Sequence, residues 1–134
     1  MPHVSRNKLS FQTEQQLTDT LDLVLSKLTR KESVKDFLLS LLTPTERIML
    51  AKRLAIIILI KEGIPQSQIS QTLHVTRITV SRLELFLEAR GKGYELALEV
   101  LKDEEALKEF KSMLLKLVGY TARAAGGRVK LGIF

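Results

Sequence analysis

The sequence predicts an all-α protein. Three observations support this: 45% of the 134 residues are hydrophobic, only three are proline and seven are glycine, and several long segments repeat apolar residues at helical spacing. Apolar residues every three or four positions line one face of a helix, and little of the chain shows the alternation of a strand. This length fits one domain with terminal extensions. We therefore expect a flexible basic arm at residues 1–12, a helical domain at 13–118 and a basic tail at 119–134.

Two amphipathic helices are predicted in the first third of the chain. The first is expected over Thr13–Lys31, because Thr13 and Gln16 resemble a capping box. A second helix is predicted over Ser33–Leu42, and it ends before Pro44 because a residue that precedes proline is disfavoured in the α region. The apolar residues of the first helix form a coiled-coil-like seam that consists of Leu17, Leu21, Val24 and Leu28.

A long central helix has the clearest start and stop signals. Thr43 can cap it, Pro44 suits its first position, and Glu46 can reach back to the N–H of the cap residue. Gly63 is a natural residue at its C-terminal end. Residues 54–60 are apolar on every side of this helix, so other helices must surround it. Together with the leucine seam upstream, this segment predicts a homodimer, because one chain of this size can barely cover it.

The stretch from Gln66 to Leu87 predicts a helix-turn-helix. Its apolar residues follow two separate helical phases, because neither one helix nor one strand places them all on one side. They are Ile69 and Leu73 in the first helix, Val75 in the turn, and Val80, Leu83 and Leu87 in the second helix. Two helices that cross steeply through a short turn can bury all of these side chains against each other. His74 lies in the turn, where the backbone often needs a positive φ that histidine tolerates better than most residues.

The second helix of this motif has a polar face suited to reading DNA. Thr76 is a good N-cap and lies near the expected phosphate. An arginine can bind guanine O6 and N7 bidentately, a hydroxyl can bond to a base edge or phosphate, and isoleucine can pack on a thymine methyl group. The predicted DNA-binding residues are Thr76, Arg77, Ile78, Thr79, Ser81 and Arg82. A helical hairpin with two solvated arginines is the alternative interpretation of this face.

Two further helices are predicted after the motif. Residues 89–93 contain two glycines and are expected to break the chain before a short helix over Tyr94–Lys102. Asp103 is expected to cap a last amphipathic helix that ends at Gly119. Its predicted apolar face consists of Leu107, Phe110, Met113, Leu114, Leu117 and Val118. The basic tail that follows could be a flexible extension or a strip that docks on a partner.

Composition narrows the function classes. The net charge is +6, and the positive excess lies in the helix-turn-helix and at both ends of the chain, which suits an anionic polymer. Cysteine is absent and His3 and His74 are the only histidines, so we expect neither disulfides nor a metal site. No histidine–acid pair accompanies a candidate nucleophile, and we therefore expect no enzyme activity and no cofactor.

The sequence shows no membrane or export signal. The N-terminus lacks the apolar segment of a secretory signal peptide. The longest apolar run, residues 54–60, is far too short to span a bilayer. We expect a cytoplasmic protein that does not bind membranes.

The central helix and the motif resemble those of the Trp repressor superfamily. The resemblance covers roughly residues 38–87, and its most specific parts are TPTER at 43–47 and TRITVSR at 76–82. It is closer to the Trp-repressor-like regulators than to the tryptophan sensor. It implies an intertwined all-helical homodimer with interlocked N-terminal helices. In such a dimer two helix-turn-helix heads read successive major grooves of an inverted-repeat operator.

The resemblance also bears on a small ligand. In the tryptophan-sensing members, an arginine of the central helix and one of the recognition helix hold the indole ring, and their matches here are Arg53 and Arg82. The sensor has a glycine directly after the second arginine, where the ligand needs room, whereas this chain has Leu83. We therefore predict that free tryptophan is not the corepressor.

The function predicted from the sequence is that of a sequence-specific DNA-binding transcriptional regulator, acting as a dimeric repressor on double-stranded DNA. Two alternatives remain open, a helical protein-interaction module and an RNA-binding protein. The deep, narrow major groove of A-form RNA disfavours the latter, because it excludes a recognition helix.

Overall fold

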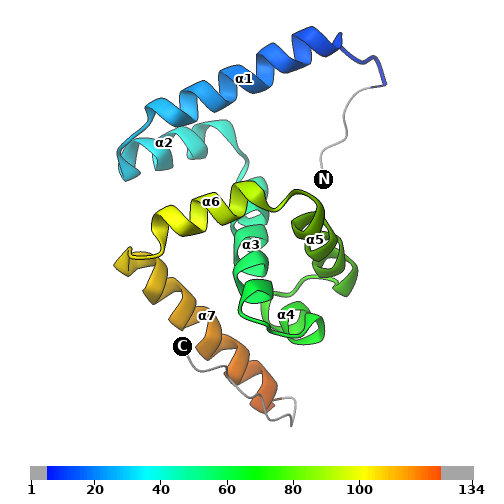
Figure 1. Cartoon of the computed structure of the whole chain (residues 1–134), viewed down its shortest axis with the longest axis vertical. Helices are drawn as coiled ribbons and strands as arrows, with labels where there is room; N and C mark the ends of the chain where they lie inside the picture. The colour runs from blue at the N-terminus through cyan, green and yellow to red at the C-terminus, as the bar shows by residue number, and fades with distance from the viewer. Residues whose placement is uncertain (1–5, 125–134) are drawn as a thin grey trace. The chain divides into compact units, whose positions relative to one another are not determined.

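The computed structural model describes residues 6–124, with side chains up to Thr121. Within these residues the chain forms seven helices and no strand (Figure 1), which confirms the predicted all-α class. The helices are α1 (Phe11–Lys27), α2 (Lys31–Leu41), α3 (Pro44–Lys61), α4 (Gln66–Leu73), α5 (Arg77–Arg90), α6 (Lys92–Leu101) and α7 (Glu105–Ala124). The chain divides into two compact units, one that ends at Arg47 and one that begins at Ile48.

The first unit contains α1 and α2, and α2 folds back along α1 (Figure 1). Helix α1 begins earlier than predicted, because Ser10 rather than Thr13 is its N-cap. The Thr13 N–H donates to Ser10 Oγ at 3.2 Å, and the Glu14 N–H donates to Ser10 O at 3.0 Å. The predicted Thr13–Gln16 capping box is therefore wrong. The helix also ends four residues early, at Lys27, because the backbone of Leu28 is extended.

Neither α1 nor α2 contains a buried residue. The leucine seam of α1 is largely open to solvent, with Leu17 58% and Leu21 40% exposed. Val24 and Leu28 are half-buried, as are Val34, Phe37 and Leu38 on α2. The first unit thus has an apolar surface with no fully buried core of its own.

The predicted start and end of the central helix α3 are confirmed. Its capping box is reciprocal: the Thr43 N–H donates to Glu46 Oε1 at 3.0 Å, and the Glu46 N–H donates to Thr43 Oγ1 at 3.2 Å. At the other end Gly63 has φ +78°, a conformation that glycine adopts without a steric penalty. The five residues from Ala55 to Leu59 are all buried, so neighbouring helices surround this part of α3 on every side.

The core of the second unit joins α3 to the helices that follow it, and Figure 1 shows α4 to α7 arranged around α3. Helix α4 packs against both α5 and α7, and α5 packs against α6. The core cluster consists of Ala55, Ile56, Ile58, Leu59, Ile64, Ile69, Val80, Leu83, Leu114, Leu115 and Val118. In the part of the chain that is described, no helix is both long and apolar enough to cross a membrane.

The last two helices differ from the predicted ones in their ends. Only Gly91 separates α5 from α6. Gly93 does not break the chain as predicted but lies inside α6, because a helix tolerates a single glycine at a modest cost in stability. Helix α7 begins at Glu105, so Asp103 is not its cap. It also continues through the buried Gly119 to Ala124 instead of ending at Gly119. Residues 125–134 of the predicted tail lie outside the described residues.

The buried face of α7 is rotated from the predicted one. Leu114, Leu115 and Val118 are buried, whereas Met113 and Leu117 are exposed. The packing of α7 on α4 determines which face of α7 is buried. The spacing of apolar residues within α7 alone does not reveal this packing.

Candidate nucleic-acid interface

Helices α4 and α5 are joined by a three-residue turn with an unusual backbone. His74 has φ +54° and ψ +50°, which is the left-handed region that histidine tolerates better than most residues. The turn is closed by two bonds between its flanks: the Val75 N–H donates to Ser70 O at 3.1 Å, and Ser70 Oγ donates to Val75 O at 2.6 Å. These contacts fix the direction in which α5 leaves α4.

Thr76 caps α5 as predicted. Its Oγ1 accepts the Thr79 N–H at 3.2 Å, and the two threonine hydroxyls lie 2.9 Å apart. The cap holds Thr76 in an extended conformation, and α5 begins at Arg77. The two hydroxyls and the first side chains of α5 therefore lie together at one end of this helix.

The inner face of the α4–α5 pair is apolar and the outer face of α5 is not. Ile69 and Val80 are 0% exposed, Leu83 is 8% exposed, and Leu73 and Val75 pack partly buried against the same cluster. The predicted DNA-binding residues lie on the other side: Thr76, Arg77, Ile78, Thr79 and Arg82 are exposed, and Ser81 is half-buried. The structure thus brings all six of these residues together over the start of α5.

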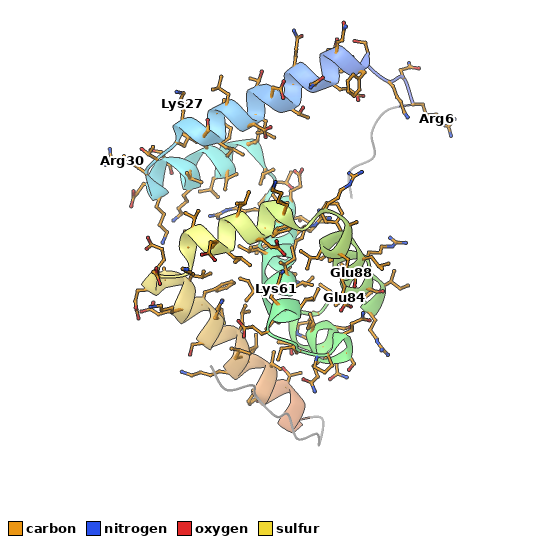
Figure 2. All side chains as sticks on the ribbon, viewed as in Figure 1. Arg6, Lys27, Arg30, Lys61, Glu84 and Glu88 are labelled. Carbon is orange, nitrogen blue, oxygen red and sulfur yellow. The ribbon has the colours of Figure 1, made fainter. Side chains whose placement is uncertain are left out.

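The two arginines of this face make no ion pair with any other residue in the described range. Acidic residues occur further along the same helix, where Figure 2 labels Glu84 and Glu88. Glu84 Oε2 accepts a short hydrogen bond from Gln66 Nε2, a half-buried contact that joins the start of α4 to α5. Sequence reasoning missed this bond, because its partners lie on different helices and neither is unusual alone.

The two arginines expected from the resemblance to hold an indole ring are both exposed. Arg53 lies on α3 and Arg82 on α5, and within the described range neither side chain forms a hydrogen bond or an ion pair with another residue. Leu83, which follows the second arginine, points into the core cluster instead of toward solvent. Its side chain fills space between helices.

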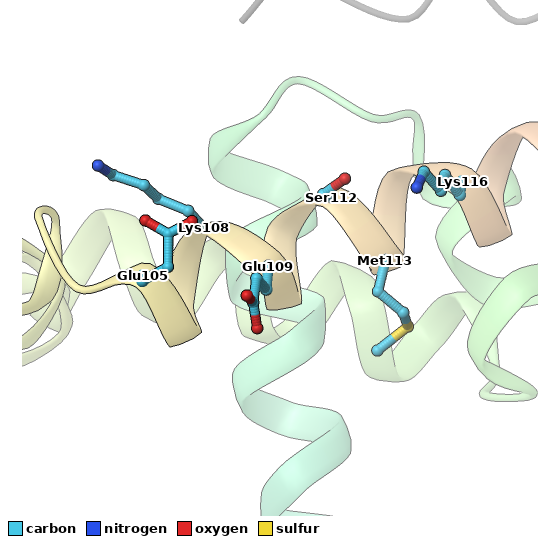
Figure 3. Close-up of a pocket in the computed structure, with 6 residues that line it drawn as sticks. All are labelled: Glu105, Lys108, Glu109, Ser112, Met113 and Lys116. Carbon is cyan, nitrogen blue, oxygen red and sulfur yellow. The ribbon is translucent and has the colours of Figure 1, made fainter.

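A shallow hollow on α7 offers no comparable site. Its lining comes from one helix alone and is open to solvent (Figure 3). The lining residues are Glu105, Lys108, Glu109, Ser112, Met113 and Lys116. In the described part of the chain, no cluster of histidine, aspartate or glutamate is arranged to hold a metal ion.

One comparison with known proteins assigns the chain to a family. The family model described as Trp repressor protein matches residues 15–102, from the first turns of α1 to the residue after α6. Searches of curated proteins and of solved structures find no match. The matched region includes α4 and α5 and leaves out α7. Because the match covers more than half of the sequence, the chain belongs to the Trp repressor family.

Proposed function

We propose that this protein is a sequence-specific DNA-binding regulator of transcription whose α4–α5 pair is a helix-turn-helix. The observation that carries the proposal is the division of α5, in which Arg77, Ile78 and Arg82 are exposed while Val80 and Leu83 of the same helix are buried. A helix with this division can lie in a groove without disturbing its own core. Membership of the Trp repressor family supports the same function.

In this proposal α5 enters the major groove with its N-terminal end first. Arg77 and Arg82 are the candidates for bidentate bonds to guanine, and Ile78 is the candidate for contact with a thymine methyl group. The Thr76 and Thr79 hydroxyls lie at the helix start, where backbone N–H groups also favour a phosphate. Ser81, half-buried beside them, can donate a hydrogen bond to a base edge or a phosphate.

The proposed regulator is a homodimer that represses by occupying an inverted-repeat operator. Support comes from apolar side chains that one chain leaves in water: Leu50 and Leu54 on α3, and Leu96 and Val100 on α6, are all exposed. Large apolar patches on a protein surface mark interaction sites. A second copy of the chain can cover them and set two recognition helices in successive grooves.

The test is DNA binding by single arginine variants. We expect Arg77→Ala and Arg82→Ala each to lose about 1–3 kcal/mol of binding free energy on a duplex selected from random DNA by the wild-type protein. Arg90→Ala is the matched control, because Arg90 is an exposed arginine at the other end of α5. Arg90→Ala should lose only the small affinity that one positive charge contributes to phosphate attraction. This loss should be the same on the selected and the scrambled duplex.

Circular dichroism establishes that each variant is folded before binding is measured. Unchanged affinity of folded Arg77→Ala and Arg82→Ala would refute the assignment of α5 as the recognition helix. Duplex RNA of the same sequence is a second comparison, and equal affinity for it would contradict a major-groove mode of reading.

A further inference from the structure

Helix α7 lies outside the part of the chain that matches the family, yet it completes the core beneath α4 and α5. The match ends at residue 102, and α7 spans Glu105–Ala124. Leu114, Leu115 and Val118 are at most 5% exposed and belong to the same buried cluster as Ile69 and Val80. The inner face of the α4–α5 pair is thus built partly by an element that the family model does not include.

The contact of α7 with this region is direct. Helix α7 packs on α4, and α5 packs on α4 as well. An ion pair adds a second attachment: Lys111 Nζ lies 3.4 Å from Glu62 Oε1 at the end of α3, and both side chains are partly buried. Glu62 is four residues before the start of α4. Helix α7 is therefore attached to α4 and to the segment that leads into it.

The position of α4 in turn determines the position of α5. The bonds across the turn between Ser70 and Val75, and the bond from Gln66 to Glu84, join the two helices at both ends of α4. A shift of α4 relative to the core would consequently move the outer face of α5 with it. Since interiors are close-packed, such a shift follows when buried contacts on one side of α4 are lost.

We propose that α7 is a positioning helix: through Leu115, Val118 and Lys111 it holds α4, and thereby the recognition helix α5, in the orientation that reads DNA. The inference rests on the proposed function. Leu115 and Val118 act through α4, Lys111 acts through Glu62 in the segment before α4, and none of the three needs contact with DNA. Sequence-specific bonds depend on the angle of α5 in the groove, whereas attraction to phosphates depends mainly on charge. Loss of the α7 contacts therefore lowers specific affinity and leaves non-specific affinity unchanged.

The experiment compares two full-length variants with one control. Val118→Ala shortens a buried side chain of α7, and Lys111→Met removes the ammonium group of the ion pair while it keeps the aliphatic chain. Ile57→Val is the control, because Ile57 is 0% exposed on α3 but lies outside the cluster that contains α4 and α7. Urea unfolding gives the folded fraction, and fluorescence anisotropy gives affinity for the selected duplex and for its scrambled version, under conditions where each protein is folded.

We expect the ratio of selected to scrambled affinity to fall about tenfold in Val118→Ala, in the range of one lost base contact. It should fall by a smaller factor in Lys111→Met and stay at the wild-type value in Ile57→Val. A purely stabilising helix predicts unchanged ratios for all three folded proteins, and that result would overturn the inference. If Lys111 contacted phosphate itself, both affinities would fall together in Lys111→Met and their ratio would stay at the wild-type value, which would contradict a positioning role for this residue.

Two remaining outcomes are also decisive. A wild-type protein that does not prefer any duplex would refute the proposed function itself, and the role of α7 in it. If Val118→Ala does not fold, Lys111→Met decides the question, since it leaves the apolar core intact, and an unchanged ratio in that variant would then refute the inference.

Discussion

Single polar residues determine where several of these helices start. Some of these N-cap residues can be predicted from the sequence and others cannot. The pair Thr43 and Glu46 caps α3 as predicted, and Thr76 caps α5 as predicted. Ser10 was missed because Thr13 with Gln16 satisfies the capping-box pattern, whereas Ser10 is followed three residues later by a threonine. The helix extends to the earlier Ser10, where the additional turn gains backbone hydrogen bonds.

The Glu46 carboxylate should make stability depend on acid pH. The backbone N–H of Thr43, and after it the Thr43 hydroxyl, lower the pKa of this carboxyl by hydrogen bonding to it. Because the folded-state pKa is the lower one, this stabilisation is complete above the ordinary pKa of an unfolded glutamate and is lost as the pH falls through the folded-state pKa. We expect Glu46→Gln to lose less stability than the wild type on acidification, as measured by urea unfolding between neutral and acid pH. Glu109→Gln is the control, and identical acid slopes in the wild type and Glu46→Gln would contradict the argument.

Leu83 leads to a prediction about ligand specificity. Its side chain is buried among Ile69 and Val80, at the position where the tryptophan-sensing members have glycine. Leucine adds four side-chain carbons at that position, and overpacking an apolar site typically costs about 1–3 kcal/mol. We expect calorimetry to show no saturable binding of micromolar tryptophan, and operator affinity to be the same with and without it. A tryptophan-dependent gain in operator affinity would show that the backbone opens a site despite Leu83.

The ends of helices were predicted well where a particular residue marks the end. They were predicted poorly where tertiary packing determines the end. Pro44 and Gly63 bracket α3, and Thr76 marks the start of α5. Gly119 has the same chemistry as Gly63 but lies in the middle of α7. The difference is tertiary: Val118 beside it is fully buried in the core, so the packing of α7 on α4 outweighs the helix-breaking tendency of one glycine.

The junction of α5 and α6 offers a matched pair of glycines. A Cβ at Gly91 would collide with the backbone carbonyl oxygen of Leu87, whereas a Cβ at Gly93 would meet nothing within 4 Å. We expect Gly91→Ala to lose about 1–3 kcal/mol of unfolding free energy, since a backbone atom must move. Gly93→Ala should gain up to about 1 kcal/mol from the higher helix propensity of alanine. Urea unfolding measures both, and equal effects of the two substitutions would contradict the steric argument.

At the scale of the whole molecule, periodicity indicated which segments are helices but not which helices meet. The contact of α7 with α4 joins segments more than 30 residues apart, and the bond from Gln66 to Glu84 depends on the crossing of two helices. Both arise from long-range packing that no local pattern encodes. The need for a partner chain stays a prediction, and it rests on the apolar residues of α1 that remain exposed beside α2.

That need leads to a prediction about assembly. No residue of α1 is buried and Leu17 is 58% exposed, although the helix repeats leucine at the spacing of a coiled-coil seam. We expect sedimentation of the intact chain at micromolar concentration to give the mass of a dimer. The preferred operator should be an inverted repeat whose half-site centres lie about one DNA turn apart, roughly 34 Å.

A charged substitution on the leucine seam of α1 tests whether the seam is a dimer interface or only an apolar stretch of surface. Leu17→Glu leaves the side chain in water if the chain is a monomer, but in a dimer it buries an unpaired carboxylate, which strongly disfavours assembly. It should therefore shift the protein toward monomers and weaken operator binding, because two linked heads bind far more tightly than one. Tyr120→Glu is the control, since Tyr120 is 70% exposed on α7 and lies on no such seam. A wild-type protein that sediments as a folded monomer, or a Leu17→Glu variant that dimerises as well as Tyr120→Glu, would refute the α1 seam as the dimer interface.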